Sequence, residues 1–445
     1  MCLGACLSLV ASYNCYKLEY TMRVCMIVPR YPPDRCGVGD YTYLLAWHLA
    51  RRGVSVDILT SRGLSDAVTL PPTDGDVIVA GGAVVGAAGV RVRVLPLIDD
   101  WGWRSLARIY AVVRTGRYDV VHIQYQNEMY GRSASIAVLP LVLRAVRPDL
   151  PTVVTVHDYG TPWPRHTRVR LLAGPYGKAW FAAMLLNARR VILTNEQDEF
   201  RFLHQRLRYP IPASRYATIP VGSNLPIPAP TMVRATAEAS LLAPQGSLLA
   251  SAGTMTVGYF GFVNPAKGVD TLLEGFAIAR RRRPHLQLVM ICQLHGTNKY
   301  LSILANRIEQ PDLADSVVIT GELGDRQAAD VLARCDIVAL PFRDGVSLRR
   351  TTLMAALALG CPVISTRAVV PPAMLEDGRD LMLVPPQDAQ ALAQSIVELA
   401  DDPDRRARLG AHAREVARAF AWPTIAERTV QLYQQAVAQS GRGSA

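Results

Sequence analysis

Lys267, which lies between a predicted strand and a predicted helix, is the residue of this sequence best placed to stabilise a negative charge. The segment 261–268 reads GFVNPAKG, so Lys267 lies beside the amino terminus of the helix expected over 268–282. Helix amino termini favour anions, and a cation placed beside one adds to that preference. Lysine is scarce in this chain and arginine is its usual cation. We therefore predict that Lys267 neutralises the charge growing on a diphosphate leaving group, with Asn264 and Gly268 contacting the same group.

A second candidate anion site lies in the segment 344–355, which reads DGVSLRRTTLMA. Ser347 is expected to cap an apolar helix. Arg349, Arg350 and Thr351 then fall in its first turn, where an anion would bind. The alternative is an ordinary helix cap with two solvated arginines.

His157 ends the apolar run 152–157, TVVTVH, which has the composition of a strand buried on both faces. A histidine at the carboxyl end of such a strand points into the crevice of an open sheet, where it can bond a sugar hydroxyl. The alternative is a packed histidine with satisfied hydrogen bonds, which is the interpretation favoured for His122.

The loop 32–40, PPDRCGVGD, joins the first predicted strand to the first predicted helix. Gly37 and Gly39 allow backbone N–H groups to approach a phosphate at the helix amino terminus. The loop is not G-x-G-x-x-G and no acidic residue follows at the ribose-binding distance, so a dinucleotide dehydrogenase fits poorly. A tight turn without a ligand is the alternative.

Alternating strand and helix patterns run through both halves of the chain and predict parallel βαβ units. The segment 226–255 breaks this alternation, being rich in Ala, Pro, Ser and Thr. We therefore expect an α/β protein with two Rossmann-like, doubly wound domains facing each other across a cleft. The expected bounds are a leader or mis-assigned start at 1–21, a first domain at 22–227, a linker at 228–255, a second domain at 256–422 and a final helix at 423–438.

Composition excludes several classes of protein. The chain has 445 residues, 50% of them hydrophobic, which supports two real cores and argues against disorder. Its net charge of +11 indicates either anionic partners or arginines spread over the surface, and aromatic and basic residues do not alternate as in a nucleic-acid groove. The eight cysteines lack metal-ligand spacing, which indicates free thiols in a reducing, cytoplasmic compartment. The apolar stretch 2–13 is too short to span a bilayer.

Taken in order, these segments resemble the retaining glycosyltransferases of family 4, which have the GT-B fold. The resemblance covers nearly the whole chain from Met22 to about Tyr433. It includes the segments 219–224 (IPVGSN), 376–386 (EDGRDLMLVPP) and 420–422 (FAW).

The resemblance implies an amino-terminal acceptor domain and a carboxyl-terminal domain that binds a nucleotide diphosphate sugar. It implies that Gly39 meets the donor phosphate or sugar, that His157 lies near the donor sugar and that Lys267 neutralises the pyrophosphate. Gly321, Glu322 and Leu323 are similar to the base-contacting segment, and a last helix near 425–434 would cross back onto the first domain.

The chain departs from the family pattern at three positions. Ser347 and Ala355 stand where the family usually has two glutamates, the second of which holds the nucleotide ribose. Phe262 replaces an arginine. The contacts that bind the donor are therefore expected to differ from those of the family. Arg349, Arg350 or Thr351 would take the place of the missing glutamates.

The expected function is transfer of a sugar, with retained configuration, from a nucleotide diphosphate sugar to a hydroxyl of a glycan, polysaccharide or lipid-linked precursor. No metal site is visible, so no metal or other cofactor is expected to be required. Arginines and aromatics in 163–172 and 177–187 suggest either peripheral contact with the inner face of the plasma membrane or a buried helix. By family analogy the setting is synthesis of the cell envelope or a polysaccharide. The alternatives are a non-catalytic GT-B protein that binds a sugar nucleotide or a partner transferase, and a nucleotide-sugar epimerase.

Overall fold

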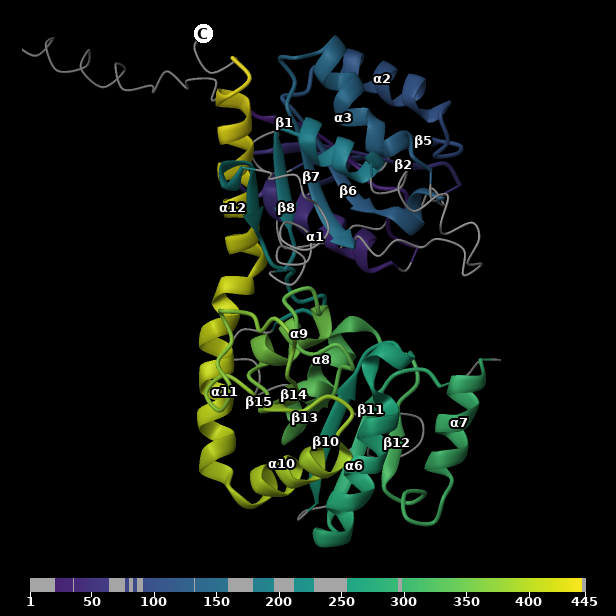
Figure 1. Ribbon diagram of the computed structural model, residues 1–445, viewed down its shortest axis with the longest axis vertical. Coiled ribbons are helices and arrows are strands. Elements are labelled where there is room, and N and C mark those ends of the chain that lie inside the picture. Colours follow the sequence, from purple (N-terminus) through teal and green to yellow (C-terminus); the bar gives the residue numbers. More distant parts are fainter. Residues whose placement is uncertain are drawn as a thin grey trace, which may run out of the picture.

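The computed structural model describes residues 21–34, 36–63, 77–79, 83–85, 91–131, 133–158, 179–195, 212–227, 254–294 and 298–441. Its helices and strands form two α/β bodies, one above the other in Figure 1. The leader expected at 1–21 and most of the linker expected at 228–255 lie outside the described residues, as does the segment 163–172.

The first body is built on a sheet in the order β3-β4-β5-β2-β1-β6-β7-β8-β9. Its strands are β1 (Arg23–Ile27), β2 (Ser55–Ser61), β3 (Val77–Val79), β4 (Ala83–Val85), β5 (Arg91–Ile98), β6 (Val120–Gln126), β7 (Thr152–Asp158), β8 (Arg190–Leu193) and β9 (Tyr216–Thr218). Helices α1 (Gly37–Ala50), α2 (Ser105–Gly116) and α3 (Ser135–Val146) flank it, with the shorter turns η1 (Asn127–Tyr130) and η3 (Ala213–Arg215).

The two faces of this sheet have separate cores. Val24 and Met26 of β1 pack in the same cluster as α1, whereas Cys25 and Ile27 pack in the cluster that holds α2 and α3. Side chains of a strand alternate between faces, so a continuous apolar run is what a strand covered on both sides requires. This is the doubly wound arrangement that the sequence predicts.

One strand near an edge of the first sheet was not predicted. The sequence pattern suggests short strands over 76–80 and 90–95 joined by a plain glycine-containing loop, but β4 lies between them and pairs antiparallel with both β3 and β5. The interpretation of residues 83–85 as part of a loop is therefore wrong. A three-residue strand is too short to show a period, so the pattern could not separate it from a loop.

The second body is built on a parallel sheet in the order β12-β11-β10-β13-β14-β15. Its strands are β10 (Met255–Phe260), β11 (Leu286–Ile291), β12 (Val317–Ile319), β13 (Ile337–Leu340), β14 (Val363–Thr366) and β15 (Met382–Val384). The helices are α6 (Val269–Arg282), α7 (Lys299–Ile308), α8 (Asp325–Arg334), α9 (Thr351–Leu359), α10 (Ala389–Asp401) and α11 (Pro403–Ala417), with the turns η4 (Pro265–Lys267) and η5 (Arg418–Phe420).

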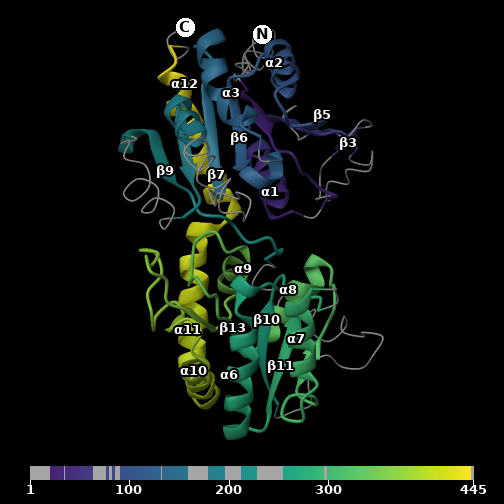
Figure 2. The same ribbon diagram turned by 45° about the vertical axis from the view of Figure 1, so that its right-hand side comes forward.

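The last helix, α12 (Trp422–Ala438), belongs to the first body although it follows the second in sequence. Figures 1 and 2 show it in yellow along the side of the upper body, continuing the line of α11. The Trp422 indole donates a hydrogen bond to the carbonyl of Ser223 at 2.7 Å, and Arg428 donates one to the carbonyl of Thr218, also at 2.7 Å. The carboxyl-terminal helix is thus fastened to the amino-terminal domain.

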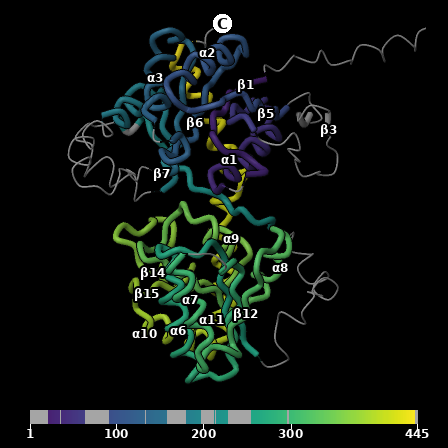
Figure 3. The backbone as a smooth tube through the Cα atoms, turned by 90° about the vertical axis from the view of Figure 1, so that its right-hand side faces the viewer, coloured from purple at the N-terminus to yellow at the C-terminus, as the bar shows by residue number. Residues whose placement is uncertain are grey.

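The two bodies meet through strand-end loops and two chain crossings. In Figure 3 the teal segment after β9 and the yellow segment before α12 both run between them. The amide of Val221 donates to the carbonyl of Leu348 at 3.2 Å, which joins the first crossing to the loop between β13 and α9. The loop between β13 and α9, which carries Ser347, Arg349 and Arg350, therefore lies against this crossing.

Candidate glycosyl-donor site

Lys267 ends the short turn η4, in the loop after β10. The Asn264 side chain accepts a hydrogen bond from the amide of Ala266 at 3.0 Å and so caps this turn. The amide of Arg343 donates to the carbonyl of Ala266, also at 3.0 Å. This bond ties the loop to the chain leaving β13.

Gly268 is required where the turn passes into α6. It has a φ of +67°, in the left-handed region, and a Cβ at this position would lie 2.0 Å from the carbonyl oxygen of Pro341. Only glycine satisfies both constraints. Its role in the structure is close packing of the two loops, while its contact with a donor stays a prediction.

The Phe342 ring contacts two of the cations that the sequence singles out. The Lys267 Nζ lies 5.1 Å from the centroid of the Phe342 ring, and the Arg350 Cζ lies 4.7 Å from the same centroid. Such cation–π contacts orient a cation without neutralising it. Sequence analysis missed Phe342, since nothing in its position after a buried strand indicates that cations gather around it.

Asp344 is the carboxylate of this group. It forms an ion pair with Arg350, and its other oxygen lies 3.5 Å from Arg349. The Arg350 side chain is only 12% exposed. The structure therefore brings together three predicted residues, Lys267, Arg349 and Arg350, with the carboxylate of Asp344 among them.

The excess of positive charge in this cluster affects the pKa of Lys267. Burial and the neighbouring Arg350 lower this pKa from 10.5 to about 8, against the opposing effect of Asp344. The lysine is still mainly protonated at pH 7. A half-buried cluster with excess positive charge is suited to an anionic group of two charges or more, and a diphosphate meets that requirement.

Ser347 does not cap α9, which corrects the sequence-based expectation. The helix begins at Thr351 with Arg350 as its capping position, and no side chain caps it. The Ser347 hydroxyl instead accepts a hydrogen bond from the amide of Arg349 at 3.4 Å, within a turn that precedes the helix. Serine side chains bond locally to the backbone in turns as readily as at helix ends, so the pattern was ambiguous.

Burial also limits what these positions offer a ligand. Ser347 is 1% exposed, and Ala355, which occupies the position of the family's ribose-binding glutamate, is fully buried within α9. Thr351 is half-buried at the first position of the helix. Arg349, Arg350 and Thr351 are expected to substitute for the two family glutamates. Their side chains are more accessible to a ligand than that of Ser347.

The predicted base-contacting segment follows β12. Gly321 has a φ of +72° and open space where a Cβ would lie. Glu322 accepts a hydrogen bond from the Gln293 side chain at 2.7 Å, and Leu323 packs against the core. Gln293 follows β11, the strand next to β12. This contact therefore lies at the carboxyl end of the sheet, as the Lys267 loop does.

His157 lies at the end of β7 and is held by a residue that sequence analysis missed. Its Nε2 lies 2.8 Å from the Oε1 of Gln124, a fully buried side chain of β6. Burial lowers the pKa of His157 to about 3, so the ring is neutral near pH 7. Because Oε1 can only accept, Nε2 carries the proton and Nδ1 is left with a lone pair.

His122 is the packed histidine that its position indicated. Its Nδ1 lies 2.6 Å from the hydroxyl of Tyr433 on α12, and its Nε2 lies 2.7 Å from the hydroxyl of Thr155. Burial and the nearby His157 lower its pKa to about 3. Both of its ring nitrogens are therefore occupied by protein groups.

Gly39 and Gly37 have different surroundings at the start of α1. A Cβ on Gly39 would lie 2.9 Å from the carbonyl oxygen of Arg30, so this glycine lets the helix pack against the end of β1. Gly37 is exposed, with nothing within 4 Å of a Cβ position. Of the two, Gly37 leaves room for a ligand beside the helix amino terminus.

The described residues hold neither a group of metal-binding side chains nor a membrane-spanning helix. His, Cys, Asp and Glu side chains do not gather there in a group of three that could hold a metal ion. No helix in the same residues combines the length and apolar character needed to cross a bilayer.

Comparison with known proteins identifies the family. A model described as "Glycosyl transferase 4-like domain" matches residues 36–222, and one described as "Glycosyl transferases group 1" matches 254–402. A D-inositol 3-phosphate glycosyltransferase from Streptomyces scabiei is 27% identical over 91% of this chain and 87% of its own.

Solved structures support the same fold. The chain resembles a sucrose-phosphate synthase from Thermosynechococcus elongatus with a TM-score of 0.68 at 21% identity, covering 94% of this chain and all of the other. Anabaena HepE in complex with UDP and glucose gives a TM-score of 0.63 at 18% identity over 93% of this chain and 100% of that one. The two domain models together match more than half of the chain. The chain belongs to the group 1 glycosyltransferases and is an enzyme of the GT-B fold that transfers a sugar from a nucleotide sugar.

Proposed function

We propose that the donor is a uridine diphosphate sugar and that its diphosphate is held by Lys267, Arg349 and Arg350. The observation that supports this most directly is the cluster of these three cations around Phe342, with Asp344 as its carboxylate. The Anabaena protein of the same fold has been solved with UDP and glucose. Gly37, Asn264, Thr351 and the segment 321–323 are the further donor contacts we propose.

We infer that transfer retains the anomeric configuration through attack on the face from which the diphosphate leaves. The bond between the anomeric carbon and the phosphate oxygen breaks, and its electron pair stays on that oxygen. The acceptor hydroxyl forms the new glycosidic bond and gives its proton to the departing phosphate. The protein contributes positioning and cations that stabilise the growing negative charge.

His157 serves this reaction as a neutral hydrogen-bond acceptor. Its Nε2–H is committed to Gln124, which leaves Nδ1 to accept a hydrogen bond from a sugar hydroxyl. A neutral ring does not oppose the positive charge that develops on the donor sugar. No metal is proposed for this chemistry, because the cationic side chains supply the charge that a metal would otherwise provide.

We propose as acceptor a hydroxyl of a glycan, polysaccharide or lipid-linked precursor, used at the inner face of the plasma membrane in envelope or polysaccharide synthesis. The excess of basic residues, a net charge of +11, favours contact with an anionic surface. No nucleic acid is proposed as a partner.

Binding and slow hydrolysis of a panel of nucleotide sugars test the donor directly. We expect one UDP-sugar to bind and to release UDP slowly in water, without added metal and in the presence of EDTA. Acceptor extracts should then accelerate UDP release. A donor that binds but never turns over, even with acceptor, would instead support the non-catalytic alternative, and an absolute need for metal would overturn the metal-free proposal.

Donor affinity should fall as the pH rises through about 8. The lowered pKa of Lys267 means that its charge is present below this pH and lost above it, and a diphosphate binds the protonated form more tightly. Calorimetric titration of UDP across this range measures the effect. The Lys267→Arg variant keeps its charge at every pH of the range and should bind with a flatter dependence. Equal slopes for both proteins would assign the titration to another group.

A further inference from the structure

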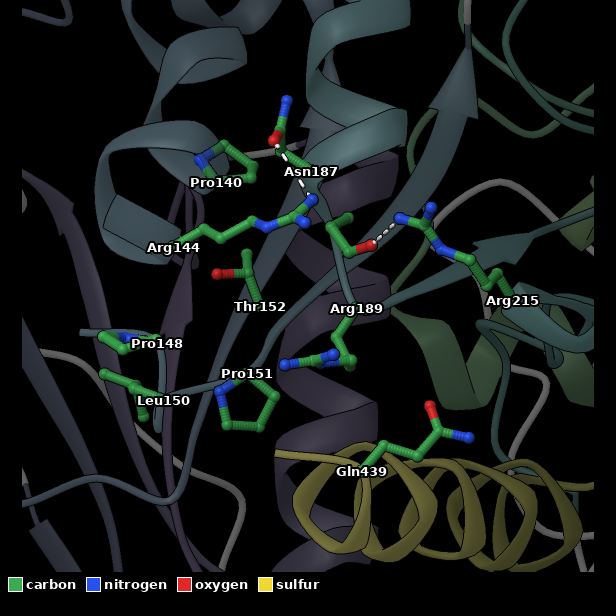
Figure 4. Close-up of a pocket in the computed structure, with 11 residues that line it drawn as sticks. Pro140, Arg144, Pro148, Leu150, Pro151, Thr152, Asn187, Arg189, Arg215 and Gln439 are labelled. Carbon is green, nitrogen blue, oxygen red and sulfur yellow. Dashed lines mark hydrogen bonds between the residues drawn. The ribbon is translucent and has the colours of Figure 1, made fainter. Parts of the chain in front are cut away.

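A hollow lined by arginines lies on the amino-terminal domain, at the end of the sheet opposite to His157. It has a volume of about 180 Å³ and is formed around the start of β7, the residues before β8 and the end of α12. Figure 4 shows Arg144, Arg189 and Arg215 around Thr152, with Gln439 of the carboxyl-terminal segment at its border. His157 ends the strand that Thr152 begins, so this hollow is separate from the donor site.

The hollow is rigidly built. The amide of Arg189 donates to the carbonyl of Thr152 at 2.7 Å, which fixes the chain at its centre. The Arg215 guanidinium donates to the carbonyls of Leu185, Leu186 and Ala188 and so closes the end of the helix over 179–187. These bonds fix the backbone around the hollow and the Arg215 side chain, while the Arg144 side chain donates a hydrogen bond to the Asn187 side chain at 3.5 Å.

The described residues that line the hollow include three arginines and no acidic residue. In the described part of the chain neither Arg144 nor Arg189 lies in an ion pair, and Asp149, which falls between two lining residues in sequence, is held by Arg147 at 3.1 Å. Burial, together with repulsion from Arg144, Arg189 and Arg190, lowers the pKa of Arg215. An anion in the hollow would relieve this repulsion.

An exposed apolar side chain lies beside the hollow on a helix that supplies one of its arginines. Leu141 is 44% exposed and precedes Arg144 by three residues on α3, so both lie on one face of the helix. An arginine beside an exposed leucine suits a surface that presents anionic groups above an apolar layer.

We propose that this hollow binds a phosphoryl group through Arg144 and Arg189, and that the group is presented by the headgroup of an anionic phospholipid. The cavity has room for a phosphate and ordered waters, since one water occupies roughly 30 Å³. Guanidinium groups bind phosphate oxygens in a bidentate manner. Bound in this way, the amino-terminal domain would rest on the membrane with Leu141 at the interface. The proposal gives the membrane contact proposed above a defined site and does not depend on the transferase reaction.

The test compares the full chain with its R144Q/R189Q variant in two binding assays without donor or acceptor. The first is co-sedimentation with vesicles of equal parts phosphatidylglycerol and phosphatidylcholine, and the second is calorimetric titration with inorganic phosphate. R281Q/R408Q removes the same charge from exposed positions on α6 and α11 and is the matched control. Circular dichroism and donor hydrolysis are measured on all three proteins, so loss of the fold or of the transferase function is seen separately.

We expect R144Q/R189Q to bind the anionic vesicles at least about tenfold more weakly, because two charge-assisted contacts are lost, while the control changes by less than about twofold. Loss of vesicle binding alone identifies a lipid headgroup, and a parallel loss of phosphate binding shows that the phosphoryl group itself is recognised. Loss of phosphate binding with vesicle binding intact would assign the hollow to a soluble ligand and overturn the lipid source. Equal binding by the three proteins in both assays would overturn the site altogether.

Discussion

Replacing Lys267 with alanine should reduce the rate of donor cleavage by about 10²- to 10³-fold, the effect seen when one preorganised charge-stabilising group is removed from an active site. The lysine ammonium lies with Arg350 at the Phe342 ring, in a cluster whose described cations outnumber the carboxylate of Asp344. Its contribution grows as charge passes to the leaving diphosphate, so kcat should fall more than donor affinity. Steady-state kinetics with the donor found in the panel measures both.

Lys299→Ala is the matched control for this variant. Lys299 is an exposed lysine of the same domain, at the first position of α7. The Lys299→Ala variant loses the same charge as Lys267→Ala without altering the cluster around Phe342. Its kinetics should match those of the wild type. Comparable losses in the two variants would show that net charge, and not the placement of Lys267, supports catalysis.

Replacing Gln124 should change both the rate and the pH dependence of the reaction. Gln124→Leu leaves the Nε2–H of His157 without its acceptor, which costs about 1–3 kcal/mol, equivalent to roughly a 10- to 100-fold loss in kcat. Gln124→Glu places a carboxylate beside the ring instead, which favours the imidazolium and raises the pKa of His157 above its present value of about 3. If the neutral ring is the active form, Gln124→Glu loses activity as the pH falls through this raised pKa, whereas the wild type does not.

The pH profile separates positioning from mere structural damage. Gln287→Leu removes a half-buried glutamine from β11 in the other domain and should leave the shape of the profile unchanged. The tautomer of His157 can be read from the ¹⁵N shifts of its ring, which should report a proton on Nε2 in the wild type. A proton on Nδ1, or a Gln124→Glu profile identical to that of the wild type, would rule out the proposed role of Gln124.

Much of the fold could be predicted from the sequence because both sheets consist mainly of buried parallel strands. Runs such as 120–123 and 152–156 are buried on both faces and mainly apolar, and glycines such as Gly360 mark where a helix ends, with a φ of +74°. The antiparallel strand β4 escaped prediction because three residues carry no period. The start of α9 was misplaced because Ser347 bonds within a turn, a use of serine that looks the same in sequence as a cap.

The candidate site was only partly predictable for a related reason. Lys267 stands out by its rarity and by the glycine after it, so its position could be read from neighbouring residues. Gln124 acts on His157 from a different strand, 33 residues away, and Phe342 meets Lys267 across two loops. Such contacts depend on which strands lie next to each other in the sheet. Short sequence patterns do not determine that order.

The attachment of α12 to the first sheet has a consequence for synthesis of the chain. His122, buried within that sheet, bonds Tyr433, which is translated 311 residues later. Chains emerge from the ribosome at about 5–20 residues per second, so the first domain waits many seconds for the helix that covers it. Until then α1 exposes the apolar face that Trp422 later covers. The amino-terminal domain is therefore synthesised first but completed only when α12 has been made. A nascent chain stalled before residue 422 would expose part of the first sheet to chaperones and proteases.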